Sequence, residues 1–336
     1  MINPYATVNW STDSQIITTT HDHVMDSNVS TTTKQHFDNL YDGGVRCFAI
    51  SNYYPSAPMY PLSDYVSDIG GTVPSDIIEV PNAEHHNLAV YGRTGNSVHI
   101  NSLGSMFSSG KPRGESPTGF AGGRVETLIA EVTSQLLYSD GGGLTLNHPT
   151  WTWEQNLFSM DTFCYLLDLD ERVLGIEIFN TNRYDTVLWD YILSTGRRCW
   201  GFTVPDHFHK SHATWYGRNV LIVPELTQHE CLRAFRNGNM YCKYANTNLK
   251  FTNIMLEDGT LTASINEPAT IKFIGDGIVI SETANTTSAS VNTDDLVQYV
   301  RIEAESAADR ILSQPIMFST QRRKNNVRRK YWQGIR

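Results

Sequence analysis

Two histidines separated by one residue, His21 and His23, directly follow a strand-like run at residues 15–20. In an extended chain, residues two apart point to the same side, so two such imidazoles can hold one cation between them. The same three residues would also suit a polar surface turn, because short motifs often match by chance. The choice between these interpretations depends on the other polar residues of the chain.

Histidines and carboxylates recur where other predicted strands end. They are Glu84 after residues 77–81, His99 within 97–100, His148 after 143–146, and Asp206, His207 and His209 after 198–203. Active sites of α/β folds assemble at the carboxyl ends of strands. Each residue alone would suit an ordinary core, surface or capping position. Together they predict a site for Zn²⁺, Mn²⁺ or Fe²⁺, with ligands for more than one ion.

The elements that must position these residues alternate between strand-like and helix-like segments over residues 15–240. Helices are predicted at 31–41, 124–137, 185–195 and 228–237, between strands that include 45–50, 173–179 and 220–223. This alternation is typical of a parallel sheet or barrel. Residues 241–320 instead carry short alternating runs with Asp-Gly turns, which predict a small antiparallel, β-sandwich-like domain. Residues 321–336 form a basic tail.

Composition sets further limits. The chain has 336 residues, 40% of them hydrophobic, which suits one large domain and a smaller one. The net charge is −9, yet the tail holds seven Arg or Lys and no acid; it is either a solvated terminus or a contact for nucleic acid or another anionic partner. Five scattered cysteines, no apolar span and no signal-like start predict a cytoplasmic protein with buried free thiols and no membrane contact.

The motif order resembles that of the PHP (polymerase and histidinol phosphatase) family of metal-dependent phosphoesterases, over most of the chain. That family has HxH with Ser-Asp, a strand ending in Thr-Asp-His, a bridging glutamate, a Val-His strand, Ala-His-Pro and a final Asp-x-His. The similar segments here are His21-Asp22-His23 with Ser27-Asn28, and residues 50–53, 78–84, 98–100, 147–149 and 206–209. The C-terminal part resembles a two-domain subgroup. The resemblance implies a distorted (β/α)7 barrel followed by a small antiparallel β domain.

The resemblance also implies a set of metal ligands. One ion would be surrounded by His21, His23, Glu84 and Asp206, and a second by Glu84, His99 and His148, with Glu84 bridging and His207 or His209 as a further ligand. The family's third metal is held by residues that correspond to Asn28 and Tyr53 here. An amide and a phenol are poor ligands beside carboxylate and imidazole, so this third site should be weak or empty.

The expected activity is hydrolysis of a phosphate mono- or diester on a small phosphorylated substrate. A metal-bridging hydroxide would attack phosphorus, and His207 or His209 would protonate the leaving group. Arg124 and Arg183 would clamp the phosphate, unless they are ordinary surface charges. The alternative is a catalytically degenerate, metal-stabilised structural or binding module, of phage origin and then virion-associated, which the residues at 28 and 53 favour.

Overall fold

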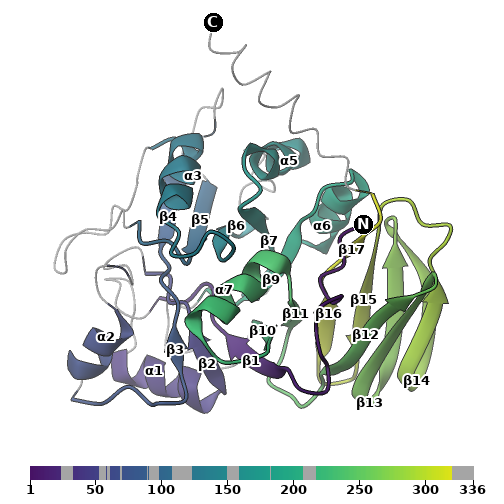
Figure 1. Ribbon diagram of the computed structural model, residues 1–336, viewed down its shortest axis with the longest axis horizontal. Coiled ribbons are helices and arrows are strands. Elements are labelled where there is room, and N and C mark those ends of the chain that lie inside the picture. Colours follow the sequence, from purple (N-terminus) through teal and green to yellow (C-terminus); the bar gives the residue numbers. More distant parts are fainter. Residues whose placement is uncertain are drawn as a thin grey trace, which may run out of the picture.

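Two β-sheets, one of eleven strands and one of six, form the frame of this mixed α/β protein (Figure 1). The computed structural model describes residues 1–23, 33–52, 58, 61–68, 70–88, 90, 98–107, 123–149, 159–181, 183–206 and 217–319. The basic tail lies outside this part of the chain, so its contact with an anionic partner stays a prediction. Among the described residues, no helix is both long enough and apolar enough to cross a membrane.

The eleven-stranded sheet begins with three parallel strands and then turns antiparallel. The parallel strands are β1 (Ser14–Thr18), β2 (Val45–Phe48) and β3 (Ile78–Glu79). Two helices accompany them, α1 (Thr33–Asp42) and α2 (Leu62–Asp68). On its other edge β1 pairs antiparallel with β10 (Arg218–Val223), and β10 pairs antiparallel with β11 (Met240–Lys243).

The same sheet continues into the C-terminal strands, which stand on the right of Figure 1. They are β12 (Phe251–Glu257), β13 (Thr260–Gly275), β14 (Ile278–Asn292), β15 (Tyr299–Glu305), β16 (Arg310–Ser313) and β17 (Ile316–Met317). Asp258-Gly259 and Asp276-Gly277 connect β12, β13 and β14, all with positive φ as two-residue hairpins require. The predicted Asp-Gly turns are confirmed. The sheet runs across residue 240, and the division into domains there stays a prediction.

The six-stranded sheet mixes parallel and antiparallel pairs. Its strands are β4 (Glu84–Leu88), β5 (Val98–Leu103), β6 (Gly143–Leu146), β7 (Val173–Asn180), β8 (Arg183–Tyr184) and β9 (Trp200–Val204). Strands β6, β7 and β9 are parallel to one another, whereas β5 is antiparallel to both of its neighbours, β4 and β6. The other helices in the described residues are α3 (Val125–Ser134), α5 (Met160–Leu169), α6 (Thr186–Ser194) and α7 (Gln228–Asn237).

The (β/α)7 barrel implied by the family resemblance is not shown. In the described residues, β10 runs against β1 and β5 runs against both of its neighbours, so antiparallel pairs interrupt the strand–helix repeat. A sheet-rich mixed α/β architecture is what the structure supports. The hydrophobic alternation of the sequence predicted most of these strands but not the direction in which each one pairs.

Buried apolar side chains lock the two sheets together. One core cluster joins Cys47 and Leu221 of the first sheet to Leu174 and Phe202 of the second. The backbone of β7 also passes very close to β9, since a Cβ on Gly175 would lie 1.8 Å from the carbonyl oxygen of Trp200. All five cysteines are buried and free, as predicted. This packing fixes the ends of strands from both sheets relative to one another.

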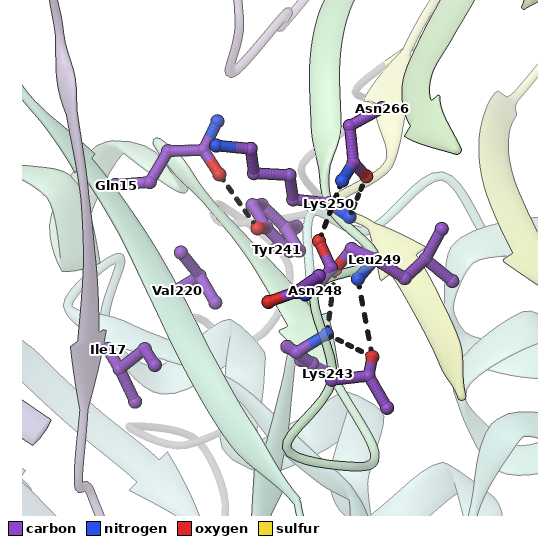
Figure 2. Close-up of a pocket in the computed structure, with 10 residues that line it drawn as sticks. Gln15, Ile17, Val220, Tyr241, Lys243, Asn248, Leu249, Lys250 and Asn266 are labelled. Carbon is purple, nitrogen blue, oxygen red and sulfur yellow. Dashed lines mark hydrogen bonds between the residues drawn. The ribbon is translucent and has the colours of Figure 1, made fainter. Parts of the chain in front are cut away.

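A separate cavity of about 420 Å³ lies on the face of β1, β10 and β11 that points away from the six-stranded sheet (Figure 2). Ile17, Val220 and Leu249 contribute apolar side chains to its wall. The amine of Lys243 also faces it but is already bonded to Asp309 and to the carbonyl oxygen of Leu249. None of its lining residues belongs to the group of histidines and carboxylates described next.

Candidate metal centre

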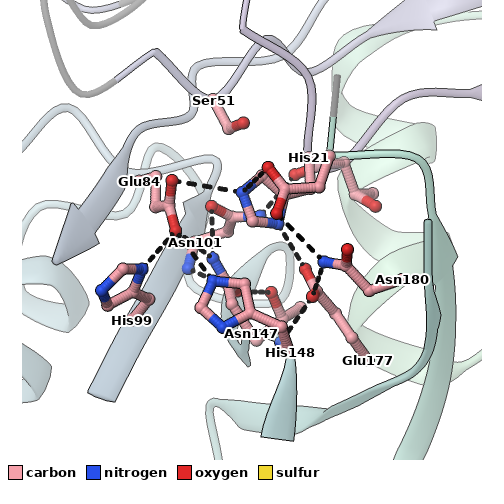
Figure 3. Close-up of polar contacts among 12 residues, drawn as sticks. His21, Ser51, Glu84, His99, Asn101, Asn147, His148, Glu177 and Asn180 are labelled. Carbon is pink, nitrogen blue, oxygen red and sulfur yellow. Dashed lines mark hydrogen bonds and ion pairs between the residues drawn. The ribbon is translucent and has the colours of Figure 1, made fainter. Parts of the chain in front are cut away.

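Six of the predicted ligands come together at one edge of the two sheets (Figure 3). They are His21, His23, Glu84, His99, His148 and Asp206. The two histidines of the HxH pair follow β1, and His148 and Asp206 follow β6 and β9. The parallel strands therefore deliver their ligands from their carboxyl ends, as the sequence predicted.

Glu84 and His99 reach the same edge in a different way. His99 is the second residue of β5, and Glu84, the first residue of β4, lies opposite Asn101 of β5. Strand β5 is antiparallel to β6, with Ile100 opposite Leu146, so its first residues lie beside the end of β6. His99 is thus placed next to His148, and their ring centroids are 4.7 Å apart. Antiparallel pairing explains how a histidine inside a strand can join the group.

Glu84 occupies the middle of the group and is almost fully buried. Its Oε2 lies 3.2 Å from Nε2 of His21 and 3.1 Å from Nε2 of His23. Its Oε1 lies 3.0 Å from Nδ1 of His99 and 3.4 Å from Nε2 of His148. Each carboxylate oxygen therefore faces a different pair of histidines.

Asp206 approaches the HxH pair from the other side. Its Oδ1 lies 3.2 Å from Nε2 of His21 and 3.7 Å from Nε2 of His23. Within the described part of the chain, neither Nε2 of His21 nor Oδ1 of Asp206 has hydrogen-bond geometry to any group, although both atoms are buried. Buried polar atoms without hydrogen bonds are costly, and a cation between them would satisfy both.

The electrostatics of the group also suit a cation. Burial lowers the pKa of His21, but the negative charges of Asp206, Glu84 and Glu177 outweigh it and raise that pKa well above its ordinary value. Burial raises the pKa of Glu84, but the charge of His21 and the close imidazoles of His148, His21 and His23 hold it well below its usual range. The carboxylates thus favour positive charge at His21. A divalent ion would displace any proton there.

The donor set therefore fits divalent metal ions. Imidazole nitrogens and carboxylate oxygens are preferred by Zn²⁺ and also serve Mn²⁺ and Fe²⁺. Among the described residues, two groups offer ligand atoms that lie within 4.8 Å of one another inside each group. One group is His21, His23 and Asp206, and the other is His21, Glu84 and His148. The fit is to metal binding in general, with neither the kind nor the number of ions fixed by it.

Glu177 in β7 is a functional candidate that the sequence analysis missed. Its Oε1 lies 2.7 Å from Nδ1 of His21, and its Oε2 accepts a hydrogen bond from the backbone N–H of His148 (2.6 Å). The side chain is 1% exposed. A signal was present, because Glu177 is the single acid in the run VLGIEIFN, and a charge buried in an apolar strand needs partners.

Two side chains of the group stand on unusual backbone. His148 has φ 28° and Asp206 has φ 48°, in the left-handed region that non-glycine residues seldom adopt. The amide of Asn180 donates to Oε2 of Glu177 (2.8 Å) and to Oδ2 of Asp206 (3.3 Å). Another amide, from Asn147, donates to Oε1 of Glu84 (3.2 Å). Side chains behind the ligands thus hold them in place.

Asp22, between the two histidines, points away from them, as alternation in an extended segment requires. It is fully buried, and its Oδ2 lies 3.5 Å from a guanidinium nitrogen of Arg218 in β10. Burial lowers the pKa of Arg218 while the charge of Asp22 opposes this. The pair links the HxH segment to the neighbouring strand.

The remaining predicted site residues are placed less centrally or fall outside the described residues. Arg183 is exposed and stands opposite Asn180 in the β7–β8 hairpin. Arg124, just before α3, has a half-exposed side chain 3.7 Å from Glu126. His207, His209, Asn28 and Tyr53 lie outside the described residues, so the terminal histidine and the weak third site stay predictions.

The fold and centre define a sheet-rich α/β protein with a buried histidine–carboxylate site suited to metal. No protein-family model matches the chain, and no curated protein matches it. Solved structures that it resembles include a two-domain protein from Bacteroides vulgatus ATCC 8482 that contains a predicted PHP-like metal-dependent phosphoesterase. The sequences are 11% identical, the TM-score is 0.49, and the match covers 95% of this chain and 97% of the other.

Proposed function

We propose that this protein is a PHP-like, metal-dependent phosphoesterase with two divalent ions. The observation that carries the proposal is the division of Glu84 between two histidine pairs, His21 with His23 and His99 with His148. A carboxylate placed in this way can serve two cations at once. The support is this geometry together with the motif order of the sequence, and the distant structural likeness is not part of it.

In this proposal each ion has its own ligands. His21, His23 and Asp206 would hold one ion and His99 and His148 the other, with Glu84 available to both. Two cations at this position would supply positive charge for phosphoryl oxygens and a water-derived nucleophile near neutral pH. Mn²⁺, Zn²⁺ and Fe²⁺ all suit these donors.

Residues at the rim of the centre would bind and orient the substrate. Directly opposed residues of an antiparallel pair project from the same face, so Arg183 lies on the face of the β7–β8 hairpin that Asn180 presents to Asp206. A guanidinium there can form paired hydrogen bonds with a phosphate. Arg124 is the second proposed clamp, and His207 or His209 would give a proton to the leaving group.

The test is metal-dependent hydrolysis of aryl phosphate mono- and diesters. Protein stripped with a chelator and reloaded with Mn²⁺ or Zn²⁺ should regain activity. His148→Ala should lower kcat/KM about 100-fold or more, because losing a ligand should cost at least as much as losing a residue behind it. His229→Ala is the matched control, since His229 is a half-exposed histidine that pairs with Asp140 on the surface. Tight metal binding without hydrolysis of any ester would contradict the proposal and favour the binding-module alternative.

A further inference from the structure

Three hydrogen-bond donors converge on one buried carboxylate behind the candidate ligands. One carboxylate oxygen of Glu177 is hydrogen-bonded to Nδ1 of His21. The other oxygen accepts hydrogen bonds from the backbone N–H of His148 and the amide of Asn180. It lies in β7, between β6 and β9, the strands that lead to His148 and Asp206. One side chain therefore touches or indirectly reaches ligands from three separate strands.

The contact with His21 decides which ring nitrogen is available for a cation. A carboxylate accepts a proton, so the hydrogen bond at Nδ1 favours the tautomer in which Nδ1 carries hydrogen. The other nitrogen, Nε2, then faces Glu84 and Asp206, each 3.2 Å away, and its lone pair becomes available when a cation displaces any proton there. A carboxylate behind a histidine fixes ring orientation and raises ligand basicity in this way.

The other oxygen holds backbone and side chains in positions that they would not adopt alone. His148 and Asp206 both have left-handed backbone, a strained conformation that persists only where surrounding contacts impose it. Glu177 accepts the N–H of His148 itself. Asn180 donates to Glu177 and to Asp206 through the same Nδ2 and so extends the support to Asp206.

We propose that Glu177, with Asn180, is a positioning pair that sets the tautomer of His21 and holds His148 and Asp206 ready for metal binding. This inference rests on the proposed metal centre, but it assigns a role to residues outside the ligand set. Neither residue is a metal ligand in it. The pair acts from behind the ligands, where it excludes alternative orientations.

Glu177→Gln is the sharpest test because it keeps the size of the side chain and removes one acceptor. Three donors point at the two oxygens of Glu177, and a glutamine would turn an NH₂ group toward at least one of them. Metal-free protein is titrated with Mn²⁺ by calorimetry and with Co²⁺ by visible absorption, without any substrate. We expect 10–100-fold weaker binding and an altered Co²⁺ spectrum.

Two further variants separate positioning from general stability. Glu303→Gln changes another buried glutamate, one bonded to Arg301 and Arg310 in the C-terminal strands, and should leave metal affinity unchanged. Asn180→Ala should weaken binding in the same direction as Glu177→Gln, but less. If Glu177→Gln does not fold, the Asn180→Ala result decides, and unchanged affinity there overturns the inference.

The outcomes also separate this inference from the proposed function. Equal affinities in wild type and Glu177→Gln would overturn the positioning role and leave the metal centre intact. If wild type binds no metal, the proposed function and the positioning role toward metal both fail, and ¹H–¹⁵N spectra of metal-free protein test whether Glu177 still sets the tautomer of His21. A protected Nδ1 proton on His21 that disappears in Glu177→Gln would support it, and an unchanged signal would overturn it.

Discussion

Removing the charge of Glu84 should abolish the response of the protein to metal at both positions. Its two oxygens face different histidine pairs, so Glu84→Gln should weaken the binding of both proposed ions. Asp206→Asn should weaken the binding of one ion, and His148→Ala that of the other. The substitution keeps the shape of the side chain. The three variants should therefore separate by the number of ions that each affects.

The magnitude follows from binding linkage. A ligand present at 1,000 times its Kd stabilises the folded state by about 4.1 kcal/mol per site. Two independent sites would thus add about 8 kcal/mol to the free energy of unfolding of the wild type. Asp206→Asn and His148→Ala should retain about half of this gain, and Glu84→Gln should retain close to none.

Denaturant unfolding with chelator or with excess Mn²⁺ measures this gain directly. Each variant is compared with its own metal-free form, which removes any stability that the substitution itself costs. Glu303→Gln should show the full wild-type gain. If Glu84→Gln kept as much metal stabilisation as Asp206→Asn, Glu84 would serve only one position and the two-ion arrangement would be refuted.

Three further predictions concern other parts of the molecule. Burial raises the pKa of Glu79 to about 7, although the N–H of Leu62 opposes this. The contribution of this one group to stability is therefore complete below pH 4.5 and is lost as the pH rises through 7. Glu79→Gln should recover at most about 3 kcal/mol of unfolding free energy at pH 8, measured by equilibrium unfolding. Thr227→Ala should cost about 1 kcal/mol in the same assay, because its hydroxyl accepts the N–H of Glu230 at the start of α7. Arg183→Ala should raise KM for aryl phosphates more than it lowers kcat, because the clamp binds substrate in its ground state.

Local sequence signals predicted the secondary structure well where a single segment decides it. The strand at 143–146 and the helix at 228–237 match β6 and α7 at both ends. Glycine after the helix explains the latter, since Gly238 adopts φ 74° at its C-terminus. Strand β14 was missed, because its Ser- and Thr-rich, largely exposed residues lack the alternation that marks a half-buried strand.

Pairing direction and long-range contacts could not be predicted in the same way. The run at 220–223 reads as a strand in either direction, and nothing within it shows that β10 is antiparallel to both β1 and β11. For the centre, residue type and strand ends were enough to select His21 and Asp206. The role of Glu177 depends on β7 lying between two other strands, and no local pattern contains that information.

The positions where this chain departs from ordinary local rules divide into two kinds. Among described non-glycine residues with positive φ, Asp258, Asp276 and Asn285 lie in hairpins or an irregular strand, where Asp and Asn tolerate such backbone. The other such residues lie at or beside the centre: His148, Thr181 and Asp206. A β-branched threonine in this conformation is a marked exception. The cost of strained backbone and buried carboxylates is therefore concentrated where β6, β7 and β9 end, and such concentration marks the part of a fold that function, more than stability, has shaped.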